Sequence, residues 1–213
     1  MGFDKTFSVI AGKTVVEHSV AAFDAAPSVS EIILVGRAER LEQLRAFSFR
    51  KVRAVVAGGI QRQDSVAAGL RQLGAEAKYV AVHDAARPLV TPEHIELVFA
   101  EAELAGAAAL AARVKDTLKR ADEHRFVAAS ISRQHVYAME TPQIFERGLL
   151  EEAYEVVQAR QIPITDEVSA VEELGRKVLL VPNETLNLKI TYPADLQIAQ
   201  LVLRDRQHAI SPA

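Results

Sequence analysis

Short apolar runs alternate with longer amphipathic stretches along most of this chain. The runs have the composition of buried strands, and the stretches between them have helical spacing; Thr91 followed by Pro92 is typical of a helix start. Strands separated by helices of about ten or more residues predict an α/β fold with a Rossmann-like, largely parallel, doubly wound sheet and helices on both faces. The predicted strands are 31–35, 52–56, 79–82, 107–114, 136–145, 177–181 and 187–190, and the predicted helices are 15–26, 38–47, 92–105, 146–161 and 166–174, with further helices beginning near 62 and 192.

One segment, about residues 115–135, departs from this alternation. Two stretches, Thr117–Ala121 and Phe126–Ile131, flank a polar turn at Asp122–His124 in the pattern of a β-hairpin. A hairpin of this size is too small to bury its own faces and usually packs on something else, often a second subunit. No linker or internal repeat divides the rest of the chain, so the sequence predicts a single domain, residues 1–213, with a protruding arm.

The composition limits the classes of protein to which the chain can belong. At 213 residues, 49% apolar and 25% charged, the chain can bury one sizeable core. A formal net charge of -3 provides no global attraction to nucleic acid or to an anionic membrane. No apolar run approaches the roughly 20 residues that cross a bilayer. The absence of cysteine excludes disulfides, thiolate zinc sites and a cysteine nucleophile. Without a cationic-then-apolar signal segment, we expect a cytoplasmic protein.

The stretch Tyr79–Pro88 carries the first candidate for function. Its strand runs directly into Asp84, and two alanines separate this carboxylate from Arg87. Ligands of open parallel sheets bind at the carboxyl ends of the strands, where a carboxylate can hold a metal ion. The alternative is a strand followed by a solvated turn. We interpret the neighbouring His83 as a partly buried structural histidine.

A second candidate is the turn at Gly58 and Gly59, after the strand at 52–56. Paired glycines let a backbone approach a ligand closely, and Arg62 and Ser65 at the start of the next helix suit an anion. The chain lacks the Gly-x-Gly-x-x-Gly spacing of dinucleotide-binding folds and the Gly-Lys-Ser/Thr of a phosphate loop. The pattern indicates nucleotide contact without an NAD or P-loop signature, and its alternative is a tight turn with a surface arginine.

Several cationic residues lie at segment ends or in turns, where a long side chain can reach a phosphate. Taken singly, most are typical of a solvated surface charge. Lys189 differs because apolar residues flank it in a predicted strand, which is a costly place for an ammonium group without a partner. That partner is either a phosphate or a buried carboxylate. The candidate cations are Lys5, Arg62, Arg87, Arg133 and Lys189.

Six motifs follow one another along the chain: Gly-Gly-x-x-Arg-x-x-Ser, His-Asp-Ala-Ala-Arg-Pro, Asp-Thr-Leu-Lys-Arg, Thr-Pro-Gln, Thr-Asp-Glu and Asn-x-Lys-Ile-Thr-x-Pro-x-Asp-Leu. In this order, they resemble the motifs of the 2-C-methyl-D-erythritol 4-phosphate cytidylyltransferases of the non-mevalonate isoprenoid pathway. The match runs from Gly2 to about Leu203. The pentitol-phosphate cytidylyltransferases share several of the motifs, but Asp116–Arg120 fits the methylerythritol group better.

The resemblance implies a reaction and a role for each candidate residue. The 4-phosphate of methylerythritol would attack the α-phosphorus of CTP, form the CDP-alcohol and release pyrophosphate. Asp84 would hold Mg²⁺ or another hard divalent cation, and Lys5 and Lys189 would neutralise charge on the α-phosphate. The family works as a homodimer, so the arm of the partner subunit would supply Thr117 and Arg133. The implied CTP-binding residues are Gly58, Gly59, Arg62, Ser65 and Asp84, and the implied sugar-phosphate-binding residues are Arg87, Thr117, Arg133 and Thr141.

Members of this family begin with a strand and a glycine-rich loop, roughly Ala-Ala-Gly-x-Gly-x-Arg, before the Met-Gly-x-x-Lys that stands here as Met1–Lys5. We therefore expect the natural protein to be longer. Without that strand, its neighbours would have exposed apolar faces and unpaired backbone groups. Two alternatives stay open: a pentitol-phosphate (ribitol 5-phosphate) cytidylyltransferase, and a nucleotide-binding dimer without turnover because the loop is missing.

Overall fold

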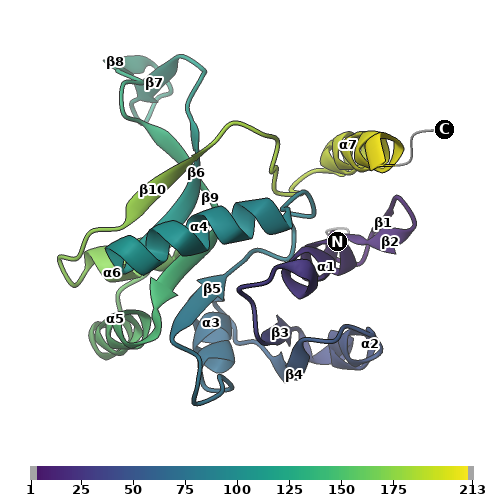
Figure 1. Ribbon diagram of the computed structural model, residues 1–213. Coiled ribbons are helices and arrows are strands. Elements are labelled where there is room, and N and C mark those ends of the chain that lie inside the picture. Colours follow the sequence, from purple (N-terminus) through teal and green to yellow (C-terminus); the bar gives the residue numbers. More distant parts are fainter. Residues whose placement is uncertain (1–3, 211–213) are drawn as a thin grey trace.

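A four-stranded sheet is the largest sheet in the described part of the chain (Figure 1). The structure is a computed structural model, and it describes residues 4–210. The strand order is β10-β6-β9-β5. β10 (Leu179–Asn183) runs parallel to β6 (Ala107–Arg113). β9 (Tyr137–Glu146) runs antiparallel to both β6 and β5 (Tyr79–Val82).

Helices cover both faces of this sheet, because alternate residues of a strand point to opposite sides. In β9, Ile144 packs with residues of α4 (Pro92–Ala105), whereas Phe145 packs with residues of α5 (Arg147–Arg160) and α6 (Glu167–Glu172). β6 is rich in buried alanines, which let the covering helices approach closely. Strands buried in this way read as the continuous apolar runs seen in the sequence.

The two ends of α4 lie where the sequence predicts them. Thr91 accepts a hydrogen bond from the backbone N–H of His94 at 3.3 Å, and Pro92 takes the first helical position. Gly106 ends the helix with a φ of 81°, in the left-handed region that favours glycine. Local chemistry therefore fixes the length of this helix.

A second, two-stranded sheet consists of β3 (Ile32–Gly36) and β4 (Val52–Ala57), which run parallel. α1 (Val15–Ala25) and α2 (Leu41–Arg45) pack on it. A 3-10 turn, η1 (Ala38–Arg40), precedes α2, so the helix predicted at 38–47 is shorter than expected. The apolar cluster between these elements includes Val16, Val20, Leu34, Leu44, Phe47 and Phe49.

A small antiparallel hairpin, β1 (Val9–Ile10) and β2 (Lys13–Thr14), leads into α1. Thr14 accepts a hydrogen bond from the backbone N–H of Glu17, whose carboxylate accepts one in return from the N–H of Thr14. This reciprocal pair satisfies two groups that a helix start leaves unpaired.

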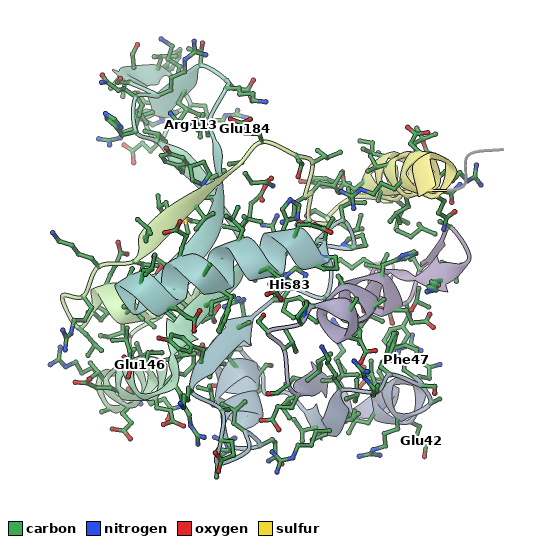
Figure 2. The ribbon with its side chains drawn as sticks, in the orientation of Figure 1. Glu42, Phe47, His83, Arg113, Glu146 and Glu184 are labelled. Atoms are coloured by element: carbon green, nitrogen blue, oxygen red, sulfur yellow. The ribbon has the colours of Figure 1, made fainter. Side chains whose placement is uncertain are left out.

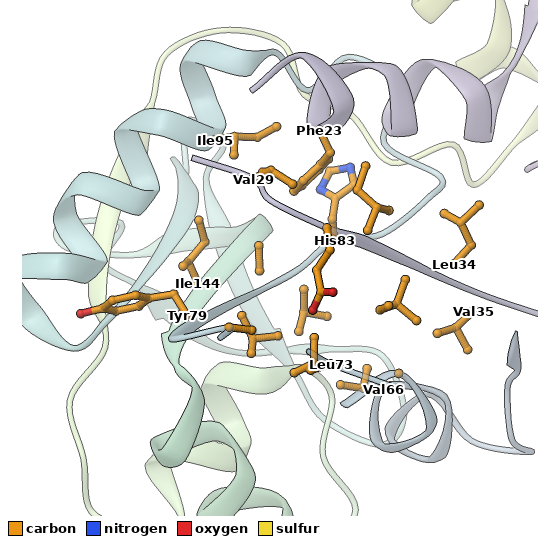
Figure 3. A pocket seen from close by; sticks show the side chains of 18 of the residues that line it. Phe23, Val29, Leu34, Val35, Val66, Leu73, Tyr79, His83, Ile95 and Ile144 are labelled. Atoms are coloured by element: carbon orange, nitrogen blue, oxygen red, sulfur yellow. The ribbon is translucent and has the colours of Figure 1, made fainter. Parts of the chain in front are cut away.

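The described residues do not form the single doubly wound sheet predicted from the sequence. β3 pairs with β4 alone, and β5 pairs with β9 alone. A cavity of about 570 Å³ is lined by residues of both β3 and β5, together with residues of α1, α3 (Arg62–Leu70) and α4. Figure 3 shows its largely apolar wall. Alternating strands and helices predict the elements, but a sheet is continuous only where each strand edge meets a partner strand.

The predicted hairpin arm is confirmed as a structural element. β7 (Leu118–Ala121) pairs antiparallel with β8 (Val127–Ile131), and the pair projects beyond the sheet from the ends of β6 and β9 (Figure 1). Every residue of β8 is exposed, and the adjoining Phe126 is 72% exposed. The arm therefore has no core of its own.

The strand predicted at 187–190 is not formed. The side-chain amide of Asn187 donates to Glu140 Oε2 at 3.2 Å and to the carbonyl of Thr141 at 3.0 Å. These side-chain contacts, rather than a strand ladder, hold the segment beside β9. α7 (Pro193–Ile210) follows it. No helix within residues 4–210 is both long enough and apolar enough to cross a membrane.

Candidate active site

Asp84 comes two residues after the end of β5 and lies among three cationic side chains. Its carboxylate is 2.9 Å from Lys189 Nζ and 3.7 Å from the Nε atoms of Arg62 and Arg87. Burial alone would raise the pKa of Asp84, but its cationic neighbours, above all Lys189, hold that pKa below its usual value. Even with Glu167, the carboxylate that pairs with Arg62, the three cations outnumber the two carboxylates, and this excess of positive charge suits a bound polyphosphate.

A chain of hydrogen bonds fixes the backbone at Asp84. Its N–H donates to Thr141 Oγ1 at 3.1 Å, and that hydroxyl lies 3.0 Å from His83 Nδ1. His83 Nε2 lies 3.3 Å from the carbonyl of Arg87. Because a carbonyl only accepts, we assign the proton to Nε2, so Nδ1 accepts from the Thr141 hydroxyl. Burial lowers the pKa of His83 to about 4, so the ring is neutral at pH 7.

His83 has the structural position expected from the sequence. Its ring packs against Phe23 of α1, with the ring centroids 5.0 Å apart. Figures 2 and 3 show it in the interior, between α1 and α4. The neutral imidazole thus joins the β5 end to β9 and α1, and it holds Asp84 indirectly.

The Gly58–Gly59 turn, between β4 and α3, has no room for side chains. A Cβ atom on Gly59 would lie 2.2 Å from Asp64 Cβ, and one on Gly58 would lie 2.5 Å from Ser65 Oγ. Ser65 Oγ accepts a hydrogen bond from the N–H of Gly59 at 3.2 Å, which closes the turn. Ile60 at its tip is fully exposed. The bare backbone of this turn is accessible to a ligand.

Arg62, the first residue of α3, connects this turn to Asp84. Its Nη1 and Nη2 both donate to the carboxylate of Glu167, with 2.7 Å between Nη2 and Oε2. Only Nε faces Asp84. Burial alone would lower the pKa of Arg62, but the pair with Glu167 raises it, so the guanidinium stays charged.

Backbone carbonyls anchor Arg87. Its Nη1 donates to the carbonyl of Asn187 at 2.8 Å, and its Nη2 donates to that of Met139 at 3.2 Å. Its buried Nε has no hydrogen-bond partner within the described part of the chain and faces Asp84. Each Nη atom carries a second N–H that can serve a ligand, whereas the buried Nε faces Asp84.

The structure brings only some of the candidate residues into contact with Asp84. Lys189 is 41% exposed in its side chain rather than embedded in a strand, and its partner is the carboxylate of Asp84. Thr117 and Arg133 lie on the arm, where Arg133 donates to the carbonyl of Lys115. Within residues 4–210, neither these two nor Lys5 forms a hydrogen bond or ion pair with Asp84 or its cations.

A family model described as "IspD: 2-C-methyl-D-erythritol 4-phosphate cytidylyltransferase" matches residues 1–205. The chain belongs to this family. The cytidylyltransferase of that name from Pelotomaculum thermopropionicum is 38% identical over 214 residues, which cover 98% of this chain and 90% of the relative. The one from Caldanaerobacter subterraneus subsp. tengcongensis is 40% identical over 206 residues, or 94% and 91% of the two chains.

Solved structures of this cytidylyltransferase family have the same fold. The 4-diphosphocytidyl-2C-methyl-D-erythritol synthase of Anaerococcus prevotii has a TM-score of 0.84 at 28% identity, over 92% of this chain and 88% of that one. The 2-C-methyl-D-erythritol 4-phosphate cytidylyltransferase of Thermus thermophilus has a TM-score of 0.81 at 30% identity, over 95% of each chain.

The residues around Asp84 can hold a Mg²⁺ ion together with a bound triphosphate, but not by themselves. Within residues 4–210 no group of three His, Cys, Asp or Glu side chains could hold a metal. Asp84 offers a carboxylate, which Lys189 already approaches at 2.9 Å, whereas the carboxylate of Glu167 is held by Arg62. Mg²⁺ is often bound through one or two carboxylates together with substrate phosphates and water. The donor set therefore fits Mg²⁺ if the triphosphate supplies most of the other ligands.

One residue of the site, Glu167, was not assigned a role from the sequence. It occurs in the Thr-Asp-Glu motif but carries no contact signal of its own, since its partner Arg62 is 105 residues away in the chain. The sequence shows only that Arg62 is a cationic candidate at a helix start and that Glu167 is an acidic residue in another predicted helix. Only the fold brings these two residues together.

Proposed function

We propose that this chain transfers the cytidylyl group of CTP to 2-C-methyl-D-erythritol 4-phosphate. A 4-phosphate oxygen attacks the α-phosphorus of CTP, the bond from that phosphorus to the β-phosphate oxygen breaks, and pyrophosphate leaves with its electron pair. The observation that carries this proposal is the three-cation arrangement around Asp84, beside the Gly58–Gly59 turn, in a member of this family.

In such a transfer, the protein mainly positions the reactants and stabilises charge. Lys189 and Lys5 would offset the charge that develops on the α-phosphate, and the turn with Arg62 and Ser65 would receive the cytosine and ribose. The attacking phosphate is ionised near neutral pH, so no general base is required. When bound at Asp84, Mg²⁺ would supply charge neutralisation along the triphosphate.

The arm supports a homodimer in this proposal. Thr117 and Arg133 are sugar-phosphate ligands that would reach the site of the partner subunit, together with Arg87 and Thr141 of the chain's own site. The support is their placement on a projecting, exposed hairpin. In the same way, the cavity between β3 and β5 supports a Rossmann-like sheet that becomes continuous when one further strand lies between them.

Pyrophosphate release tests the proposal. CTP with Mg²⁺ is incubated with methylerythritol 4-phosphate and, separately, with ribitol 5-phosphate. We expect turnover with the first alcohol phosphate, little with the second, and a loss of about a hundredfold or more in Asp84→Asn, whose amide cannot neutralise a divalent ion. CTP binding by calorimetry without pyrophosphate release, or a preference for ribitol 5-phosphate, would contradict the proposal.

A further inference from the structure

Glu167 is a completely buried carboxylate at the start of α6. A buried carboxylate is costly unless it is paired and hydrogen-bonded. Both of its oxygens accept hydrogen bonds from Arg62, and the hydroxyl of Tyr154 donates to Oε1 at 3.0 Å. Arg62 is thus its charged partner, and Tyr154 is a neutral one.

The position of Glu167 is fixed from the interior of the larger sheet. Gln143 of β9 is 1% exposed, and its Oε1 accepts from the backbone N–H groups of Glu167 and Val168, each at 3.2 Å. Its Nε2 donates to Asp166 Oδ2 at 3.0 Å. The buried amide therefore ties the first turn of α6 to the sheet, and Glu167 is a fixed point against which Arg62 is held.

Two carboxylates can receive the guanidinium of Arg62. Its fork of two N–H groups points at Glu167, and only Nε faces Asp84 Oδ1, at 3.7 Å. A guanidinium pairs most strongly with a carboxylate through its fork. If Glu167 lost its charge, Asp84 would be the neighbouring carboxylate available to that fork. Arg62 would then occupy Asp84 Oδ1, since Lys189 already contacts Oδ2 at 2.9 Å.

We propose that Glu167 is a positioning residue that holds the fork of Arg62 away from Asp84. Asp84 Oδ1 and the turn at Gly58–Gly59 then stay open for CTP. This inference rests on the proposed function, because it assigns Asp84 and Arg62 to the CTP site. It gives the Thr-Asp-Glu motif a role that acts on CTP binding rather than on the sugar phosphate.

Calorimetric titration of CTP, without the sugar phosphate and therefore without turnover, tests the inference. We expect Glu167→Gln to raise the Kd for CTP by roughly tenfold and to raise the KM for CTP in turnover to a similar degree. The KM for methylerythritol 4-phosphate should change by less than about twofold. A purely structural role would instead lower the amount of active protein or change both KM values together.

A double-mutant cycle separates action through Arg62 from general damage. We expect Arg62→Met to weaken CTP binding, and we expect Arg62→Met/Glu167→Gln to bind CTP no more weakly than Arg62→Met, within about twofold. Once the fork is absent, there is nothing left for Glu167 to hold. Additive losses in the double variant would overturn the inference.

Glu31→Gln is the control, because Glu31 also pairs with an arginine, Arg53, at 2.7 Å, and within the described residues neither partner forms an ion pair with Asp84 or Arg62. It should leave the Kd for CTP within about twofold of the wild type. If the Glu167→Gln variant does not fold, CTP binding is measured with the Tyr154→Phe variant instead. That variant removes one hydrogen bond to Glu167, and we expect CTP binding to weaken by about twofold to fivefold.

The possible failures are distinguishable. A wild-type chain that binds CTP while Glu167→Gln or Tyr154→Phe binds it equally well would reject only the role of Glu167. A wild-type chain that binds no CTP would reject the proposed function as well. Equal weakening by Glu31→Gln would also count against the inference, since the effect would then follow from losing any Arg–Glu pair.

Discussion

At the scale of single residues, the charge of each site group is decided by its immediate neighbours. Asp84 stays ionised in spite of its burial because Lys189, Arg62 and Arg87 surround it. His83, one residue away, is neutral at pH 7 because burial outweighs the attraction of that carboxylate. Of these two adjacent residues, Asp84 is charged and can act on a ligand electrostatically, whereas His83 is neutral and supports the structure.

The pH dependence of stability can be predicted from a histidine outside the site. Burial, with Arg206 as a second cause, lowers the pKa of His94 below its usual value. The unfolded chain therefore takes up a proton at His94 before the folded chain does. The stabilisation is fully present above a pH of about 6.5 and is lost as the pH falls through the lowered folded pKa. Between pH 7 and 5, the free energy of unfolding should therefore fall more steeply in the wild type than in a variant without this histidine.

His94→Gln provides the comparison for this prediction. Gln at the third helical position can take over the hydrogen bond that His94 Nδ1 accepts from the N–H of Thr91 at 3.2 Å, and it does not titrate. Urea denaturation of both proteins at pH 7 and pH 5 measures the difference, and the other histidines cancel because they are common to both. Identical pH slopes for the two proteins would show that His94 does not contribute.

Sequence reasoning identified most of the residues around Asp84, because the carboxyl ends of neighbouring strands meet at one edge of a sheet. It missed the pair of Arg62 and Glu167, which depends on how α6 packs relative to α3. It also placed Lys189 in a buried strand, whereas the side chain is partly exposed. The identity of a residue and its position in an element were predictable. A partner more than a hundred residues away was not.

At the scale of elements, the arm is the part of the molecule most open to a direct test. We expect Arg133→Ala to raise the KM for methylerythritol 4-phosphate by about tenfold or more while the KM for CTP changes by less than about twofold, because hydrogen bonds to charged groups contribute roughly 1.5–3 kcal/mol. Steady-state kinetics with each substrate varied in turn measures both constants.

Lys119→Ala is the control on the same hairpin. Lys119 Nζ donates to Ser130 Oγ across the two arm strands at 2.6 Å, and it has no proposed ligand. Both KM values should stay within about twofold in this variant. Equal changes in the two KM values for Arg133→Ala, or a matching effect of Lys119→Ala, would contradict the role assigned to the arm.

Elements were predictable where local chemistry determines them. The α4 helix begins after Thr91 and ends before Gly106 because a capping side chain and a left-handed glycine stand at its two ends. The segment at 187–190 has the apolar composition of a strand, yet Asn187 is held by side-chain and carbonyl contacts to β9. Composition alone does not reveal that a segment lacks a partner strand.

At the scale of the whole molecule, the two sheets lie on opposite sides of the cavity between β3 and β5. Most of the residues that line this cavity are apolar, so an apolar strand that fills it should stabilise the fold.

We expect a synthetic peptide of alternating valine and alanine residues, about six residues long with polar ends, to bind between β3 and β5 and raise the unfolding midpoint by several degrees. Each face of the inserted strand would meet apolar residues, and its backbone would pair with both strand edges. Thermal unfolding followed by circular dichroism measures the shift. The control is the same peptide with every amide N-methylated, which keeps the apolar side chains but removes the backbone donors on both edges. A midpoint that rises equally with both peptides would show apolar adsorption without strand pairing, and an unchanged midpoint would show that the cavity does not accept a strand.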